Sequence, residues 1–532
     1  MLSDASNSVL KRLDWSERAS TISNSETITY NRNDRSPIGF FLEWFYSVIP
    51  LIYDSPVFGF YWKTPLDSFI KFLSLLKNSN QRLALTPTNS LTLDIRRAVR
   101  KLDLTNINYH IYKDIKPDWL YKLITRLPNL EHINMKKFEY VSNDSILFLY
   151  NRFSSRSVSH FSCISNAACL NNLDFSPHSH IFQSLKFLGI GSCSNLSAIS
   201  LQILLSLFTN LSSLSAPNLY CLNDTVLSII SQNLKSLLTL DISRSPNATD
   251  IGFIRLSKIP LRNLRVSGCK NISNSSLENL SNFPSLRVFD ISLNSKIDYT
   301  GFHKLRRRLE IARLDSLHRP FSGSTNLVFS PTTSTTTNTI PIAQSNSSHS
   351  FGSMAITALL AHGCNKLVQP LDFSGLYHIS QVLPKLSYLT LSYSSLIPKS
   401  SDSAAINLNK LGLVLETFEN LVSLEIHDIN EPVHLDTFLV FANRLPAIKT
   451  IKLLVVTASI HQRCGIESSF ENGSSSTEPD QSYDSDDSIF RSVPKIKKYL
   501  LNKSKVDELN QLSTQIGRNV TFIYIPIDPI EY

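Results

Sequence analysis

A leucine pattern that returns every 24 to 26 residues constrains this 532-residue chain more than any other feature. Five segments have the form L-x-x-L-x-L, with small variations, and they begin at Leu185, Leu211, Leu237, Leu261 and Leu286. A chain of this length exceeds what one compact core normally accommodates. A stack of similar units accommodates it, because each unit then contacts only its neighbours.

The pattern inside each unit predicts a strand followed by a helix. Apolar alternation over L-x-L predicts a short strand with one buried face. The strands should be centred on Leu188, Leu214, Leu240, Leu264 and Phe289. A Cys or Asn follows most strands, and its side chain can bond to the backbone of the turn. The helical stretch should bury residues at helical spacing. These residues are Val226, Ile229, Ile230, Ile251, Ile254, Leu256, Leu277, Leu280, Phe302 and Leu305.

The start of each helical stretch narrows the type of repeat. Thr249, Asp250 and Gly252 match the I-T-D-x-G-L helix start of cysteine-containing leucine-rich repeats, and Thr300 and Gly301 match it more loosely. Asp, Ser or Thr at this point can cap the helix. The period also lies within the 20–29 residues typical of leucine-rich repeats. The chain therefore resembles an α/β leucine-rich-repeat solenoid, a horseshoe with parallel strands on the concave face and helices on the convex face.

The repeats extend in both directions, and we expect about eleven or twelve of them. Further strand centres are predicted at Leu102, Ile133, Phe161, Leu314, Leu389, Leu424 and Ile451. A strand from Val520 should close the array after an amphipathic helix over Val506–Ile516.

Composition divides the chain into seven segments. These are a disordered N-terminus (1–37), an aromatic-rich helical module (38–98), repeats (99–320), a disordered Ser/Thr/Asn-rich insertion (321–352), further repeats (353–465), an acidic Ser-rich disordered insertion (466–489) and a helix–strand cap (490–532). The insertions hold too few apolar residues to offset the entropy of ordering them. The acidic insertion is either simply solvated or phosphorylated at Ser482, Ser485 and Ser488.

The module 38–98 carries a second resemblance. Helices are predicted over Phe40–Val48 and Pro65–Lys77. The residues that carry the resemblance are Trp44, Pro50, Leu51, Tyr53, Ser55, Pro56, Phe58, Ser68, Phe69, Phe72, Leu73, Leu76, Val99, Arg100, Leu102, Asp103 and Leu104. In this order they are similar to the end of the F-box and its join to the repeats in fungal F-box/leucine-rich-repeat proteins. The join also resembles that of antagonist of mitotic exit network proteins.

The F-box resemblance implies a substrate-recognition subunit of a cullin–RING ubiquitin ligase. A Skp-type adaptor and a cullin would then be partners, and the adaptor would contact Phe41, Trp44, Pro50, Leu51 and Tyr53. The segment before Trp44 is polar and lacks the Leu-Pro that begins a full F-box. The alternative is that residues 38–98 cap the open apolar end of the solenoid.

Charge and cysteine content argue against several other classes. The net charge of +9 is spread along the chain. Its densest run, Arg306 to Arg308, lies on a predicted helix where the side chains should point in different directions into solvent. Nucleic acid is therefore not the expected partner. The seven cysteines form no CxxC pair, which disfavours a zinc site or a disulfide framework. No signal peptide is evident, and Glu43, Pro50, Asp54 and Pro56 interrupt the apolar stretch Gly39–Trp62. We expect a cytoplasmic or nuclear protein with reduced thiols.

Catalytic motifs are also absent from the sequence. It contains no GxGxxG, GxxxxGK[ST], HExxH or GxSxG. Asp174, His178 and His180 could be drawn as a metal site, but Pro177 and the neighbouring serines favour a solvated loop. We expect no enzyme activity, no metal and no cofactor.

The partner is predicted to lie across the concave strands. The residues predicted to point outward beside the buried leucines are Asp103, Lys186, Asp241, Arg244, Arg265, Arg287 and Asp290. Their mixed signs suit a specific protein surface. A substrate receptor of a ubiquitin ligase, a leucine-rich-repeat scaffold or inhibitor without a ligase, and an RNA-associated repeat protein remain as readings of the sequence.

Overall fold

The computed structural model describes residues 53–56, 58, 65–83, 95–107, 115–153, 184–318, 354–368, 373–396, 408–429, 435–456 and 501–527. The chain forms two compact units, which are described separately. The first comprises residues 1–111 and 122–132, and the second comprises residues 112–121 and 133–532.

The first unit contains α4 (Pro65–Leu83), α5 (Ile95–Ala98) and β1 (Lys101–Asp103). Helix α4 begins at Pro65 as predicted and continues past Lys77 to Leu83. The ring of Phe58 packs edge-on against Phe69 and Phe72, with centroids 5.4 and 5.6 Å apart. All three rings are buried, so they form an apolar cluster within the first unit. The helix predicted over Phe40–Val48 lies outside the described residues.

Two elements, α6 (Trp119–Arg126) and β2 (His132–Asn134), have residues in both units. In the second unit, the Trp119 indole N–H donates to the Tyr140 carbonyl at 3.0 Å, and the ring packs edge-on against Phe138. Ile133 is buried at the centre of β2, as predicted.

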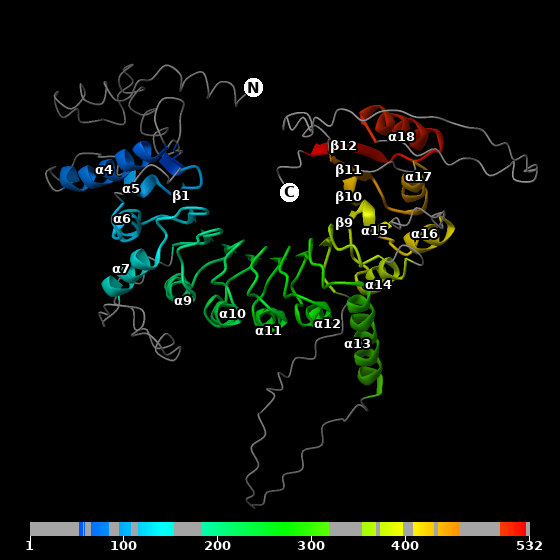
Figure 1. Ribbon diagram of the computed structural model, residues 1–532, viewed down its shortest axis with the longest axis horizontal. Coiled ribbons are helices and arrows are strands. Elements are labelled where there is room, and N and C mark those ends of the chain that lie inside the picture. Colours follow the sequence, from blue (N-terminus) through cyan, green and yellow to red (C-terminus); the bar gives the residue numbers. More distant parts are fainter. Residues whose placement is uncertain are drawn as a thin grey trace, which may run out of the picture. The chain divides into compact units, whose positions relative to one another are not determined.

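The second unit holds a row of short strands that follow one another in the sheet in chain order (Figure 1). They are β3 (Phe187–Gly189), β4 (Ser213–Ser215), β5 (Thr239–Asp241), β6 (Asn263–Arg265), β7 (Val288–Asp290), β8 (Ala358–Leu360), β9 (Tyr388–Ser392), β10 (Ser423–Ile429), β11 (Thr450–Val456) and β12 (Thr521–Ile527). Neighbouring strands are parallel. The register places Leu240 between Leu214 and Leu264, and all three are at most 1% exposed. Leucine therefore stacks on leucine along the array.

Helices alternate with these strands along the chain. They are α7 (Asn143–Phe153), α9 (Ala198–Leu207), α10 (Asp224–Asn233), α11 (Asp250–Arg255), η4 (Leu256–Lys258), α12 (Asn274–Glu278), η5 (Leu280–Asn282), α13 (Tyr299–His318), α14 (Ser374–Val382), α15 (Tyr393–Leu396), α16 (Leu408–Leu415), α17 (Leu435–Arg444) and α18 (Lys503–Gln515). Figure 1 shows α9 to α12 in a row on the convex side of the second unit, with the strands on its concave side. This is the predicted leucine-rich-repeat solenoid. The closing pair is present as α18 and β12, although the helix begins at Lys503, after the cap Asn502, rather than at Val506.

One predicted strand centre is wrong. Leu314 lies in α13 and is 54% exposed, because the repeat's helix continues unbroken to His318 instead of turning back. The strand after β7 is β8, where Leu359 pairs with Phe289. The insertion therefore separates this helix from the next strand. Phe161, another predicted strand centre, lies outside the described residues.

Two of the three residues predicted to be buried in α11 and η4 are wrong. Ile251 is 60% exposed and Ile254 is 36% exposed, whereas Leu256 is fully buried as predicted, and Phe253 takes the buried position on α11. The helix is six residues long and passes directly into the 3₁₀ turn η4, so the phase is set by its cap at Thr249.

Helix caps join each repeat to the one before it. The Asp224 carboxylate, at the start of α10, accepts hydrogen bonds from the backbone N–H (2.9 Å) and the hydroxyl (2.6 Å) of Thr249, the N-cap of α11. Asp250 does the same for Ser273, the N-cap of α12, at 2.8 and 2.6 Å. A Cβ on Gly252 would collide with the Asp224 carboxylate and with Leu227. The Thr-Asp-x-Gly motif is therefore a contact between repeats as well as a cap.

The Cys or Asn after each strand makes a second link. The thiols of Cys193, Cys269 and Cys364 donate to the backbone carbonyls of residues 135, 242 and 291, each in the preceding described repeat, at 3.1–3.2 Å. Burial raises the pKa of Cys193 and of Cys364 to about 12 and that of Cys269 to about 11. These thiols remain protonated at neutral pH, as a donor must.

The column of stacked leucines should dominate stability. Leu240→Ala would leave a cavity between two neighbouring repeats and is expected to lower the free energy of unfolding by about 2–5 kcal/mol. Ile251→Ala, at the exposed position on α11, should have little effect. Denaturant titration of both variants checks this, and equal losses would refute the assignment of Leu240 to the core.

The cap link predicts coupling between two residues that are far apart in sequence. Asp224→Ala removes both hydrogen bonds to Thr249, whereas Thr249→Ala removes only the one from the hydroxyl, because alanine keeps its backbone N–H. The hydroxyl bond is lost in both single variants, so the double variant should cost less than the two single changes added together. We expect a coupling of about 0.5–2 kcal/mol in a double-mutant cycle. Strictly additive losses would mean that the two side chains act independently.

Candidate partner-binding face

The concave face is formed by the residues on either side of each buried strand centre. Asp241, Arg265 and Asp290 occupy the same position on β5, β6 and β7, and the register pairs Arg265 with both aspartates. Four of the seven predicted partner-binding residues lie elsewhere. Asp103 ends β1 in the first unit, Lys186 and Arg287 directly precede β3 and β7, and Arg244 lies in the turn after β5.

The three predicted acidic residues serve the backbone. Asp103 Oδ1 accepts from the Thr105 backbone N–H at 2.9 Å, and the equivalent bonds are 3.1 Å from Ser243 to Asp241 and 3.0 Å from Ser292 to Asp290. In each case the carboxylate holds the residue two positions later, which is the usual Asp-stabilised turn. Asp290 is moreover only 8% exposed. These carboxylates shape the turns after the strands.

Three of the predicted cations are exposed and unpaired. Among the described residues, the side chains of Arg244, Arg265 and Arg287 make no hydrogen bond or ion pair, and all three are exposed. Arg287 is held by its backbone, because its carbonyl accepts from the N–H groups of Thr357 and Ala358 at 2.8 and 3.0 Å. Lys186 is also exposed.

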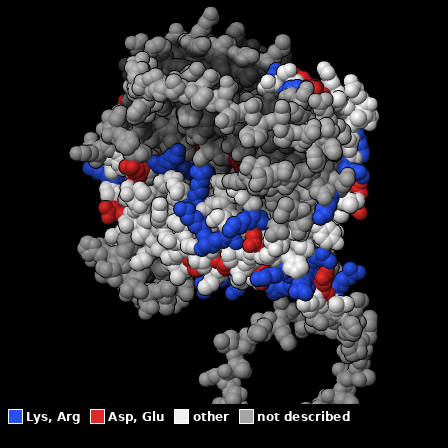
Figure 2. Space-filling model, turned by 45° about the vertical axis from the view of Figure 1, so that its right-hand side comes forward, with Lys and Arg blue, Asp and Glu red and all other residues white. Residues whose placement is uncertain are grey.

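The exposed cations over β5 to β7 outnumber the two aspartates, Asp241 and Asp290, so the net charge there is positive. Arg262, which directly precedes β6, and Lys270, in the turn after it, are also exposed and were not among the predicted residues. Arg262 occupies the same repeat position as Lys186 and Arg287, so aligning the repeats would have found it. Figure 2 shows Lys and Arg side chains forming a band on the described part of one face, where Asp and Glu are fewer.

Arg244 stands at an unusual backbone position. Its φ is +58°, and the equivalent residues of other repeats, among them Asn218, Gly268 and Gly363, are also left-handed. This backbone conformation costs a residue with a Cβ roughly 1–2 kcal/mol, and a hydrogen bond to the neighbouring repeat holds Arg244 in it. There the Arg244 N–H donates to the Ser267 carbonyl at 2.6 Å.

A second polar cluster lies on β9 to β11. Glu425 accepts from Tyr388 Oη at 2.5 Å and bonds to His427 Nε2 at 2.8 Å, and Lys452 Nζ lies 3.3 Å away. Burial raises the pKa of Glu425, but the hydrogen bonds and the charges of His427 and Lys452 outweigh it and lower that pKa to about 2. Glu425 is therefore ionised and fully partnered.

Two histidines stack beside this cluster. The rings of His362 and His427 are 4.2 Å apart and nearly parallel, at 7°. They come from either side of β9, where Ser392 at the same repeat position is small and donates to Asp428 at 2.6 Å. Burial and the charge of His427 lower the pKa of His362 against the opposing effect of nearby carboxylates. Sequence reasoning missed this pair, because its two residues are 65 positions apart, with all of β9 between them.

Most predicted adaptor-binding residues lie outside the described part of the chain. These are Phe41, Trp44, Pro50 and Leu51. Tyr53 is described and half-buried, and burial raises the pKa of its hydroxyl. The sketched metal site at Asp174, His178 and His180 also lies outside. Among the described residues, no three His, Cys, Asp or Glu side chains are grouped to hold a metal ion.

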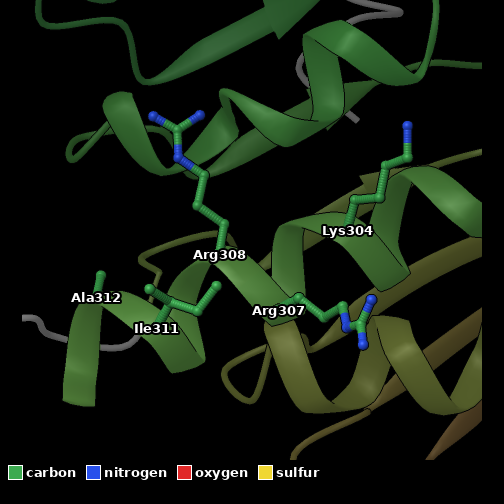
Figure 3. A pocket seen from close by; sticks show the side chains of 5 residues that line it. All are labelled: Lys304, Arg307, Arg308, Ile311 and Ala312. Atoms are coloured by element: carbon green, nitrogen blue, oxygen red, sulfur yellow. The ribbon is translucent and has the colours of Figure 1, made fainter. Parts of the chain in front are cut away.

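The arginine run on α13 is mostly engaged with the protein. A shallow hollow of about 420 Å³ is lined by Lys304, Arg307, Arg308, Ile311 and Ala312, and Figure 3 shows Arg307 and Arg308 leaving the helix in different directions. Arg308 donates to the Glu278 carbonyl at 3.1 Å, and Lys304 lies 3.0 Å from the Glu278 carboxylate. Both side chains are exposed, as expected of a solvated face, and their contacts with Glu278 also link α13 to α12. None of the described helices combines the length and apolar character that a membrane crossing requires.

No protein-family model and no curated protein matches the chain. Three solved structures are similar to it in fold. Rad7, from the crystal structure of the Rad7 and Elc1 complex in yeast, is 14% identical with a TM-score of 0.42, over 85% of this chain and 96% of that one. TLR13, in a complex with ssRNA13, is 17% identical with a TM-score of 0.35, over 68% and 41%. An internalin from Listeria monocytogenes is 15% identical with a TM-score of 0.30, over 71% and 88%. These likenesses carry no functional argument.

Glu425 should make stability depend on pH. Because its folded pKa is depressed, its ionised form stabilises the fold above about pH 4.5, and this contribution is lost as the pH falls through about 2. Glu425→Gln should lower the free energy of unfolding at neutral pH by about 1–3 kcal/mol and flatten its decline over that window. Denaturant titrations across the window check this, with the exposed Glu419→Gln as control. Parallel pH profiles for Glu425→Gln and the parent would contradict it.

Proposed function

We propose that this protein is a binding receptor whose concave face, over β5 to β7, holds a partner protein. The observation that carries the proposal is the set of exposed, unpaired arginines Arg244, Arg265 and Arg287. Their backbones are fixed by hydrogen bonds between repeats, so a partner finds the surface already arranged and less ordering opposes binding.

Within this function, we propose that the receptor is the substrate-recognition subunit of a cullin–RING ubiquitin ligase. The support is the F-box-like order of aromatic and Leu/Pro residues over residues 38–98. The buried cluster of Phe58, Phe69 and Phe72 is compatible with a packed adaptor-binding module. The alternative function is a leucine-rich-repeat scaffold or inhibitor without a ligase, in which the same module serves as a cap. Either function would be carried out in the cytoplasm or nucleus.

A tagged pull-down separates these two functions. The full chain should capture a Skp-type adaptor and a cullin, and the double variant Phe41→Ala/Trp44→Ala should lose both while keeping its melting temperature. Failure of the full chain to capture the adaptor would reject the ligase role and leave the scaffold.

The same pull-down tests the concave face. Thr239→Trp places a large side chain between the outward residues of β4 and β6, so it should abolish capture of the concave-face partner while leaving the adaptor bound. Ile251→Trp, on the convex side, is the matched control. Loss of the partner with the control variant alone would place the binding surface on the helices.

A further inference from the structure

We propose that the partner binds through an acidic segment, whose Asp and Glu side chains face Arg262, Arg265, Arg287 and Arg244 across β5 to β7. This inference rests on the proposed receptor function and names the chemistry of its partner.

The spacing of the four arginines is set by the sheet. The Arg287 backbone N–H donates to the Arg262 carbonyl at 2.8 Å, so the two residues stand at the same position on adjacent strands. Adjacent strands are about 4.8 Å apart, and Arg265 lies three residues beyond Arg262, or about 10 Å along the strand. Arg244 approaches the same strand from the turn after β5, where its backbone lies against Gly268. Gly268 lies six residues beyond Arg262, or about 20 Å along the chain, so an extended segment with several carboxylates is needed to reach all four arginines.

The protein's own carboxylates leave these cations unsatisfied. Asp241 and Asp290 flank Arg265 in the register, but their side chains accept from backbone N–H groups and form no ion pair with it. Exposed like charges at this spacing repel one another, and an opposite charge from a partner relieves the repulsion. Arginine also pairs with a carboxylate through two parallel hydrogen bonds, which favours oriented acidic side chains.

The extent of the group favours a protein segment over a nucleic acid. On one side, the equivalent residues of β3 and β4 are Gly189 and Ser215, and on the other side β8 has Leu360. At the position of Arg265 the two neighbouring strands carry Asp241 and Asp290, and at the position of Arg262 and Arg287 the flanking residues are Leu238 and Thr357. The cations therefore do not continue as an unbroken track for a phosphate backbone. The outward residues between them, Thr239, Asn263 and Val288, offer no aromatic ring on which a base could stack.

The test is direct binding of fluorescein-labelled hexaglutamate to the full-length protein by fluorescence anisotropy at low ionic strength. Arg265→Glu/Arg287→Glu should weaken binding by at least about tenfold. The control changes the net charge equally at two exposed lysines away from the strands, Lys258→Glu/Lys296→Glu, and should bind as the parent does. Equal melting temperatures confirm that all three proteins are folded.

Two results would overturn the inference. One is an equal loss of affinity in the two double variants, which would mean that hexaglutamate senses only net charge. The other is tighter binding of labelled hexauridylate than of hexaglutamate, with the same dependence on Arg265 and Arg287, which would make the face a nucleic-acid site.

Competition against a partner captured in the pull-down separates the two proposals. If Thr239→Trp abolishes capture, yet Arg265→Glu/Arg287→Glu retains it and hexaglutamate does not compete, the receptor function stands and the acidic partner is rejected. If Thr239→Trp leaves capture unchanged, the concave-face receptor itself is rejected.

Discussion

The contact on which this structure depends is the packing of each strand's central leucine against the same leucine of the next repeat. A strand of three residues buries one side chain, as Leu214, Leu240 and Leu264 do on consecutive strands. One such residue cannot hold a 25-residue unit together, so the unit is stable only within the stack. The polar links also join neighbouring repeats. The Asp224 carboxylate accepts a hydrogen bond from the N-cap residue of the next repeat's helix, and the Cys269 thiol donates to a carbonyl of the previous repeat. The repeat motif is thus a set of contacts between neighbours.

That arrangement determines which charges are available for binding. The polar positions nearest the strand exits must satisfy the turn, and Asp103, Asp241 and Asp290 do so through the backbone N–H two residues later. Arginine has no acceptor and cannot perform this task. The acidic side chains at the ends of the strands consequently accept hydrogen bonds from the backbone of the turns, while basic ones such as Arg265 remain exposed. The surface keeps both signs, but its arginines are the side chains that the fold leaves without a hydrogen-bond partner.

The sequence was sufficient for features that depend on neighbouring residues and on the repeat itself. The strand centres from Leu188 to Phe289, the cap at Thr249 and the closing strand could all be predicted, because the buried face and the capping hydroxyl have local signatures. The prediction of which helix residues are buried was wrong at Ile251, because a short helix is oriented by its cap. The prediction of a strand at Leu314 was wrong because an L-x-x-L spacing also suits a helix. The pair His362 and His427 could not be predicted, since β9 lies between β8, which precedes His362, and β10, which contains His427, and the two residues are 65 positions apart in the sequence.

The turn at Arg244 connects stability to the proposed site. Glycine occupies the equivalent left-handed position at Gly268 and Gly363 without strain, so the fold itself does not require a long cationic side chain there. The backbone of Arg244 is held by the bond to Ser267, and this allows the strained residue to persist. Ser192, Asn218 and Leu293 are left-handed as well, so the turn accepts a strained residue in several repeats. The guanidinium of Arg244 forms no hydrogen bond or ion pair with the described residues, which leaves it available to a partner. Its position beside Arg265 and Arg287 then accounts for a side chain that the repeat alone leaves unexplained.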